Sequence, residues 1–144
     1  YLSRSLRWKK HHCEMVGIIP GDTVMHDKPI GRGYARIIET GAAPWPGSDP
    51  DRCYHVHEFH YSSLENLPAG LQYAYTLERG HGIDRQHDGF LYKNLIANYV
   101  HLRDVDTNHW TQRFLDFVRV VRDSATAKNT QSITGSTAFL PPFM

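Results

Sequence analysis

The sequence predicts a mixed α/β fold with several short strands and few helices. Short apolar or alternating runs, bounded by glycine and proline, recur through the first hundred residues and are typical of strands. Only one long segment, residues 108–122, has its apolar residues at helical spacing. Residues 1–6 have the character of the last turns of another helix. Such a set is unusual for a complete fold but natural for the C-terminal part of an α/β domain.

The predicted elements follow one another with short connections. Residues 22–30 are expected to be a loop or an irregular edge strand, residues 41–51 a loop, and residues 63–68 a turn or half-helix. A hairpin is expected to turn at Lys93 and Asn94. The helix has N-cap candidates in Asp106, Thr107 and Asn108. The strands are predicted at residues 15–19, 35–39, 52–59, 72–77, 88–92 and 95–101.

These elements indicate a partial domain over residues 1–122. Residues 123–144 form a tail rich in Ser, Thr and Ala, with little apolar surface to bury. A segment of this composition is expected to be poorly ordered.

Composition and charge exclude several classes of partner. Sixteen Lys and Arg residues nearly balance fifteen Asp and Glu residues, so we expect no nucleic-acid partner. No stretch approaches the roughly 18 apolar residues of a membrane span, and we expect no signal peptide because the first twelve residues are polar and basic. The two cysteines are fewer than a secreted scaffold would usually carry, so we expect a cytoplasmic protein with no membrane partner.

The most distinctive stretch is residues 55–62, which contains three histidines, a carboxylate, a phenol and a hydroxyl. In a strand, His55, His57 and Phe59 would share one face, and Glu58 and His60 the other. Two polar faces make poor core, so this strand is expected to border a site. Either a metal centre or a pocket for an organic substrate would suit these side chains.

Four motifs occur in order along the chain: residues 15–22 (MVGIIPGD), 31–34 (GRGY), 57–62 (HEFHYS) and 98–103 (NYVHLR). Together they resemble the glutamine amidotransferase domain of the cobyrinic acid a,c-diamide synthase family, over residues 1 to about 122. The resemblance implies the C-terminal part of a class I amidotransferase domain, which is flavodoxin-like, truncated before Tyr1.

In that family, a cysteine releases ammonia from glutamine, and the ammonia aminates an ATP-activated carboxylate of a tetrapyrrole. The resemblance therefore implies glutamine and an ammonia-accepting synthetase domain as partners, and leaves a homodimer open. It implies ATP and Mg²⁺ for the synthetase domain and no cofactor in this chain. The tetrapyrrole could be cobyrinic acid, hydrogenobyrinic acid or sirohaem.

The resemblance places the nucleophilic cysteine upstream of Tyr1, so this fragment alone is expected to be inactive. Cys13 and Cys53 do not replace it, because each lacks the strand before and the helix after that activate a thiol. His101 closes an apolar strand and is the predicted catalytic base. Wider class I enzymes have a glutamate two residues after this histidine, whereas this chain has Arg103. We favour a Cys–His dyad, with Glu58 as the alternative supporting acid.

The resemblance assigns Glu58, His60, Tyr61 and Ser62 to binding of the charged ends of glutamine. A structural role, in which Glu58 and His60 pair with each other or with Arg103, is equally compatible with the sequence. The alternative function is a non-catalytic metal-binding or interaction module built on residues 55–60, although His60 would face away from the two other histidines. Arg32 in its glycine turn could contact an anionic group or the synthetase domain, but a solvated arginine is the favoured interpretation. Asp84 and Asp88 are expected to be solvated.

Overall fold

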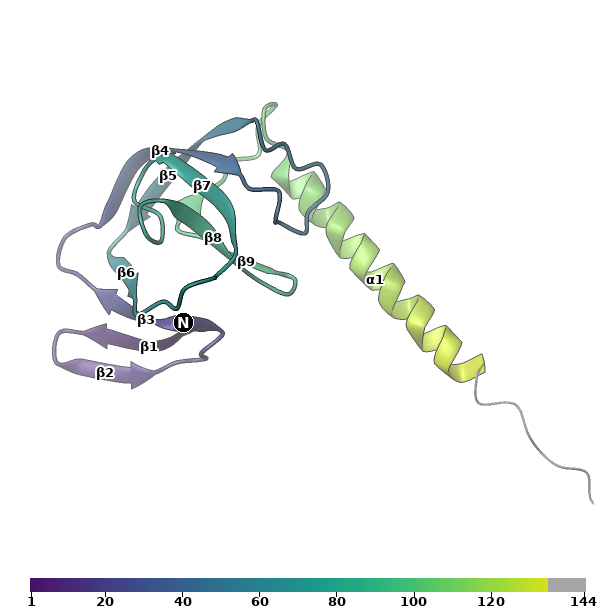
Figure 1. Cartoon of the computed structure of the whole chain (residues 1–144), viewed down its shortest axis with the longest axis horizontal. Helices are drawn as coiled ribbons and strands as arrows, with labels where there is room; N and C mark the ends of the chain where they lie inside the picture. Colours follow the sequence, from purple (N-terminus) through teal and green to yellow (C-terminus); the bar gives the residue numbers. More distant parts are fainter. Residues whose placement is uncertain (135–144) are drawn as a thin grey trace, which may run out of the picture.

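The computed structural model describes residues 1–134, which form two β-sheets and one helix (Figure 1). This agrees with the predicted fold class of mixed sheets with few helices. Residues 1–134 contain ten strands rather than the six expected, because residues 3–8, 11–14 and 62–65 also form strands and the strand expected at residues 95–101 is divided into two.

The smaller sheet is mixed. Strands β1 and β3 run parallel, and the other neighbours are antiparallel. Its strands, in spatial order, are β2 (His11–Glu14), β1 (Ser3–Trp8), β3 (Ile19–Met25) and β6 (Ser62–Glu65).

The larger sheet is antiparallel throughout, and its two edges are the shortest strands. Its strands, in spatial order, are β10 (Val100–His101), β5 (Cys53–His60), β4 (Gly31–Glu39), β7 (Tyr73–Arg79), β8 (His87–Tyr92) and β9 (Leu95–Ala97). The predicted hairpin is confirmed, since β8 pairs with β9 across Lys93 and Asn94.

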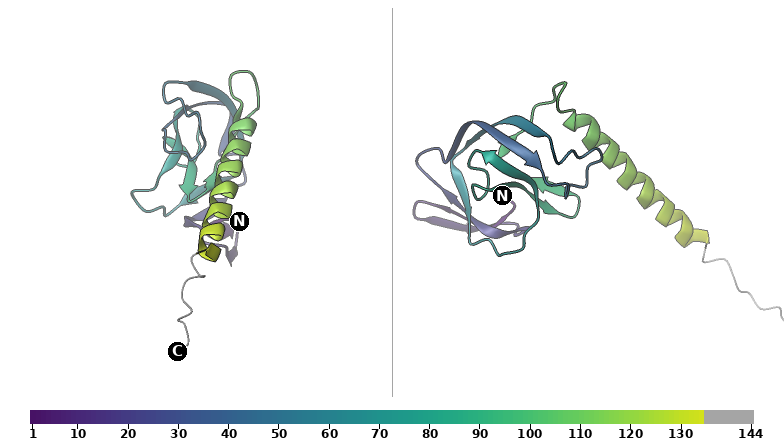
Figure 2. Two further views of the ribbon diagram at one scale, coloured as in Figure 1. Left: turned by 90° about the vertical axis from the view of Figure 1, so that its right-hand side faces the viewer. Right: turned by 45° about the horizontal axis from the view of Figure 1, so that its top comes forward.

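The apolar core has two parts. One lies on the inner face of the larger sheet and includes Ala35, Ile37, Val56 and Val100. The other centres on Ile19, Ile83 and Phe90, around which apolar residues from both sheets pack. This second cluster joins the two sheets. Figure 2 shows the arrangement of the sheets and the helix from two further directions.

The prediction that residues 1–6 end a helix is wrong. They contain most of β1, in which Ser3 and Ser5 point inward while Arg4 is exposed. Because the inward side chains are those of serines, the alternation of buried and exposed residues in β1 does not appear as an alternation of apolar and polar residues in the sequence. The hydroxyls of these serines are hydrogen-bonded: Ser3 donates to the Ser5 carbonyl and accepts from the Thr23 hydroxyl, and Ser5 donates to the Asp22 carboxylate.

Two other secondary-structure assignments are also corrected. The strand expected at residues 15–19 lies later, because most of that apolar run connects β2 to β3. Residues 62–65 form β6 instead of a turn or half-helix, since they extend the smaller sheet beside β3.

The helix α1 (Trp110–Thr134) continues beyond the predicted end near residue 122. Its first turns dock on the larger sheet and its remainder extends away from both sheets (Figures 1 and 2). In the part of the tail that the structure describes, Ser124 and Thr126 donate to carbonyls four residues earlier, so their hydroxyls are accommodated within the helix. The rest of the predicted tail, residues 135–144, lies outside the described residues. No helix in residues 1–134 combines the length and apolarity that a membrane crossing requires.

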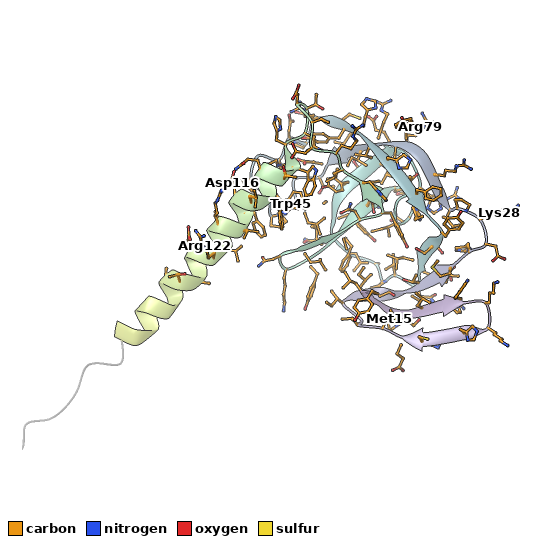
Figure 3. The ribbon with its side chains drawn as sticks, turned by 180° about the vertical axis from the view of Figure 1, so that it is seen from behind. Met15, Lys28, Trp45, Arg79, Asp116 and Arg122 are labelled. Atoms are coloured by element: carbon orange, nitrogen blue, oxygen red, sulfur yellow. The ribbon has the colours of Figure 1, made fainter. Side chains whose placement is uncertain are left out.

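A buried ion pair holds α1 in place. Arg113 donates from both terminal guanidinium nitrogens to the Glu39 carboxylate of β4, at 2.6 and 3.2 Å, and from Nε to the Pro46 carbonyl. Trp45 stacks on Trp110 and meets the edge of Phe114. Figure 3 shows Trp45 beside the base of α1.

Candidate functional site

His101, the predicted base, lies at the exposed end of the edge strand β10. It pairs in register with His57 of β5, and the two imidazole centroids are 6.0 Å apart. Tyr34 of β4 continues this row, with its ring centroid 6.1 Å from that of His57. The three side chains therefore form an aromatic row, His101–His57–Tyr34, on the outer face of the larger sheet. A reactant could reach the His101 imidazole from this face without any rearrangement of the sheet.

Glu58 lies on the opposite face and is 4% exposed. Its two carboxylate oxygens accept the backbone N–H groups of His81 and Gly82, at 2.8 and 3.0 Å. Because cross-strand neighbours share a face, Glu58 is paired with Val100 rather than with the His101 side chain. In this arrangement Glu58 braces the loop after β7 and does not orient the His101 imidazole.

His60 is buried beside Glu58. Its Nδ1 lies 2.8 Å from the Ser62 carbonyl, an acceptor, so Nδ1 carries the proton in this bond. Its Nε2 is 3.6 Å from a Glu58 oxygen, which is too long for a hydrogen bond, and has no hydrogen-bond partner in the described structure. The ring stacks on Tyr99 with a centroid separation of 3.9 Å.

The first glycine of the GRGY motif, Gly31, leaves room for the buried His60 side chain. A Cβ built on Gly31 would lie 2.1 Å from His60 Nε2, so no larger residue can stand opposite this imidazole. Gly31 thus lets the backbone of β4 lie close to the His60 side chain of the neighbouring strand β5. Arg32, the next residue, is exposed, as expected from the sequence.

Tyr61 and Ser62 differ in their surroundings. Tyr61 is 39% exposed and its ring meets the edge of Phe59. The Ser62 hydroxyl is 3.0 Å from the Tyr99 hydroxyl. Burial raises the pKa of the Tyr99 phenol, and the bond to Ser62 partly offsets this rise. Ser62 can therefore present its hydroxyl to a ligand only in competition with Tyr99.

The predicted site residues open onto different hollows. Ser62 lines a cavity of about 240 Å³ between the two sheets, together with Ser3, Thr23 and Tyr99. His101 lines a hollow of about 290 Å³ with Trp45, Trp110 and Phe114 at the base of α1. Asn98 borders both. The segment from Asn98 to His101 is therefore the structural link between the predicted base and the predicted substrate residues.

A larger hollow, of about 520 Å³, lies over β1 and β2 and contains none of the predicted site residues. Both of its arginines are already paired: Arg4 donates to Asp22 through two nitrogens, and Arg7 donates to Glu65. We therefore place the candidate site at residues 98–101 instead.

Neither cysteine has the setting of a nucleophile in the described residues. Cys13 is exposed in β2, and Cys53 opens β5, where its thiol contacts Arg36 and Glu78. Within residues 1–134, no helix begins directly after either cysteine, because α1 starts only at Trp110. The helix N-terminus that would lower a thiol pKa is missing at both positions.

The histidine strand does not assemble a metal centre within residues 1–134. In β5, His55 and His57 are exposed whereas His60 is buried on the other face. No group of three or more His, Cys, Asp or Glu side chains in this part of the chain is arranged to hold a metal ion. The donors that suggested a metal are divided by the pleat of the strand.

Asp88 is the residue that sequence reasoning missed. It was expected to be solvated with Asp84, but its side chain is fully buried at 0% exposure. Asp84 does remain exposed, and bonds to His87. An acidic residue at the start of an apolar run, followed by glycine, is the signal that could have identified Asp88.

The family model and the curated relatives that match this chain point to the same family. Residues 1–107 match the model of the CobB/CobQ-like glutamine amidotransferase domain. The chain is 42% identical over 118 residues to the cobyrinate a,c-diamide synthase of Magnetococcus marinus, covering 82% of this chain and 25% of that protein. It is 31% identical to the enzyme of the same name from Archaeoglobus fulgidus, covering 80% and 24%. The corresponding Picrophilus torridus protein is 34% identical, with 80% and 23% covered. The chain thus spans about a quarter of the length of these curated relatives.

Proposed function

Because the chain belongs to the CobB/CobQ-like glutamine amidotransferase domain family, we propose that it is the C-terminal part of the glutaminase domain of a tetrapyrrole amidoligase. The observation that carries this proposal is the family match together with the exposed His101 at the end of β10. The relatives' printed name favours cobyrinic acid as the acceptor, with hydrogenobyrinic acid and sirohaem as alternatives.

In the proposed reaction, a cysteine from another part of the longer protein attacks the side-chain carbonyl carbon of glutamine. His101 accepts the thiol proton and returns a proton to the nitrogen as the C–N bond breaks and ammonia leaves. Water then hydrolyses the thioester, releasing glutamate and restoring the thiol. The ammonia reaches a synthetase domain, where it displaces the phosphate of an activated carboxylate.

The position of Glu58 supports a Cys–His dyad. Its oxygens are already bound to two backbone amides, and its side chain is on the opposite face of the sheet from His101. His57, the imidazole beside His101, is the side chain best placed to limit the rotation of the base.

Glutamine binding is proposed for Glu58, His60, Tyr61 and Ser62 as a group. Of these four residues, Ser62 lines a cavity, and His60 has a buried Nε2 atom without a hydrogen-bond partner in the described residues. ATP and Mg²⁺ are proposed for the synthetase domain, where the acceptor carboxylate would be activated.

A glutaminase assay on this chain and on the longer protein tests the proposal. We expect glutamate release by the longer protein and none by the 144-residue chain. Turnover by the chain alone would contradict the assignment of the nucleophile to another part of the protein. Stoichiometric zinc in protein purified without a histidine tag would instead favour the metal-binding alternative.

The role of His101 is tested in the longer protein by His101→Ala. We expect glutamine-dependent amidation to fall by at least about 100-fold, as is typical for loss of an acid–base group, while ammonia-dependent amidation is retained. His55→Ala is the matched control, since His55 is exposed on the same face. Unchanged glutamine-dependent activity in His101→Ala would exclude the base assignment.

A further inference from the structure

The segment that leads into His101 is held by a carboxylate from a distant strand. Asp88 of β8 accepts the Val100 backbone N–H at 2.8 Å, and both of its oxygens lie 3.1 Å from the Tyr99 backbone nitrogen. Eleven and twelve residues separate the partners in sequence, so this contact is tertiary. It fixes the backbone immediately before the predicted base.

A buried carboxylate is costly, so its position calls for a physical reason. Burial raises the pKa of Asp88, whereas the N–H groups of Val100, Tyr99 and Gly89 oppose this rise. A regular sheet would satisfy the same N–H groups with carbonyls of an adjacent strand at a smaller desolvation cost. Here β10 is an edge strand of two residues whose only strand neighbour in the described structure is β5. The Asp88 carboxylate takes the place of the missing neighbour.

The packing around Asp88 leaves it little freedom. Gly89 has a φ of +72°, and a Cβ at that position would lie 2.8 Å from the Tyr75 ring and 2.9 Å from Ala74. The backbone that carries Asp88 therefore lies directly against β7. A rigid support of this kind can hold its partner residues within the small tolerance that catalysis requires.

Val100 is consequently restrained at three points. Asp88 binds its N–H, the Asn98 side-chain amide donates to its carbonyl, and its side chain is 1% exposed in the core. Since side chains alternate across a strand, fixing Val100 inward directs His101 outward into the His101–His57–Tyr34 row.

We propose that Asp88 is a positioning residue for His101: its carboxylate fixes the Tyr99 and Val100 amides and thereby sets the direction of the imidazole. The inference rests on the proposed function of His101 as the base. It adds a residue that neither touches substrate nor lies on the face of the site.

The first test uses the 144-residue chain and compares Asp88→Asn with the control Asp84→Asn. Asparagine keeps the shape of the side chain but replaces one acceptor oxygen with a donor, whereas Asp84 is exposed and remote from β10. We expect Asp88→Asn to retain its circular dichroism spectrum. Amide exchange at Val100 should accelerate by about tenfold, the equivalent of one lost hydrogen bond, and the nuclear Overhauser contacts between the His57 and His101 rings should weaken. Asp84→Asn should change neither.

A folded Asp88→Asn chain with unchanged exchange at Val100 and unchanged ring contacts would overturn the proposal. Asp88→Ser, which keeps a small acceptor, is the second variant. If both variants lose the fold while Asp84→Asn keeps it, Asp88 supports the whole domain rather than His101, and the proposal is also overturned.

The second test uses kinetics in the longer protein. A misplaced base should lower kcat for glutamine hydrolysis by about 100-fold, with little change in KM and with ammonia-dependent amidation retained. An unchanged kcat in an active protein would contradict positioning. If the longer protein has no glutaminase activity at all, the proposed function fails, while the exchange and ring-contact measurements still decide what Asp88 does to His101.

Discussion

At the residue scale, the alternation of β5 was predictable, but the buried face was not. His55 and His57 share the exposed face and Glu58 and His60 the buried one, as a period of two requires. Both faces are polar, so hydrophobicity does not distinguish them. The amides of His81 and Gly82, which lie far along the chain, make the Glu58 side the buried one.

Replacing Glu58 with Gln should destabilise the domain by about 1–3 kcal/mol, because the new amide nitrogen would face a backbone N–H that loses its acceptor. Urea unfolding followed by tryptophan fluorescence measures this change. Glu78→Gln is the control: Glu78 forms a partly exposed ion pair with Arg36, and its loss should cost less than about 1 kcal/mol. Equal effects of the two substitutions would show that the buried bonds of Glu58 do not stabilise the fold.

At the scale of elements, the start of α1 is set by a residue outside the predicted N-cap. Asp104 accepts the backbone N–H and the side-chain hydroxyl of Thr111, whereas the sequence favoured Asp106 to Asn108. The chain folds back through a bridge between Val105 and Asn108, which brings Asp104 to the helix end. A cap formed across such a loop is not evident from local sequence.

The Asp104 cap predicts a pH dependence of the first turn of α1. The Thr111 hydroxyl and then its N–H lower the pKa of Asp104 from its ordinary value. A depressed pKa in the folded state means that the cap stabilises the helix above the unfolded value, near 3.9, and that this contribution is lost as the pH falls through the folded value. Helical Cα shifts of Trp110 to Arg113 should therefore decline as the pH is lowered from 5 towards 2.

Asp104→Asn provides the critical comparison, because asparagine caps helices without titrating. Its helical shifts should be nearly independent of pH over this range. Asp106→Asn should behave like the wild type. A pH-dependent loss that persists in Asp104→Asn would assign the titration to another group.

At the scale of the whole molecule, the two sheets depend on a shared apolar cluster. Phe90 of β8 is 3% exposed, and around this cluster pack residues of the smaller sheet such as Leu64. Phe90→Ala should therefore cost about 3–5 kcal/mol and lower the urea midpoint for both sheets together. Tyr92→Ala on the same strand is the control, since Tyr92 is 44% exposed and its loss should have a much smaller effect. Separate transitions for the two sheets in wild-type protein would contradict a single cooperative body.

The sequence by itself determined the family, the mixed α/β class, the strand predicted at residues 52–59 and the hairpin at Lys93 and Asn94. The family is confirmed by the match over residues 1–107. It could be predicted because sequence motifs are recognised from residue types in order, without knowledge of the fold. The hairpin and the histidine strand are also confirmed. Both could be predicted because turn residues and a side-chain period of two are local properties of the sequence.

Only the tertiary structure decided that residues 1–6 form a strand, that Glu58 faces away from His101, and that Asp88 is buried behind the predicted base. Each depends on polar groups whose partners lie far along the chain: Thr23 for Ser3, the His81–Gly82 amides for Glu58, and the Tyr99 and Val100 amides for Asp88. A buried polar group requires a partner, but its own residue type does not specify where in the sequence that partner lies.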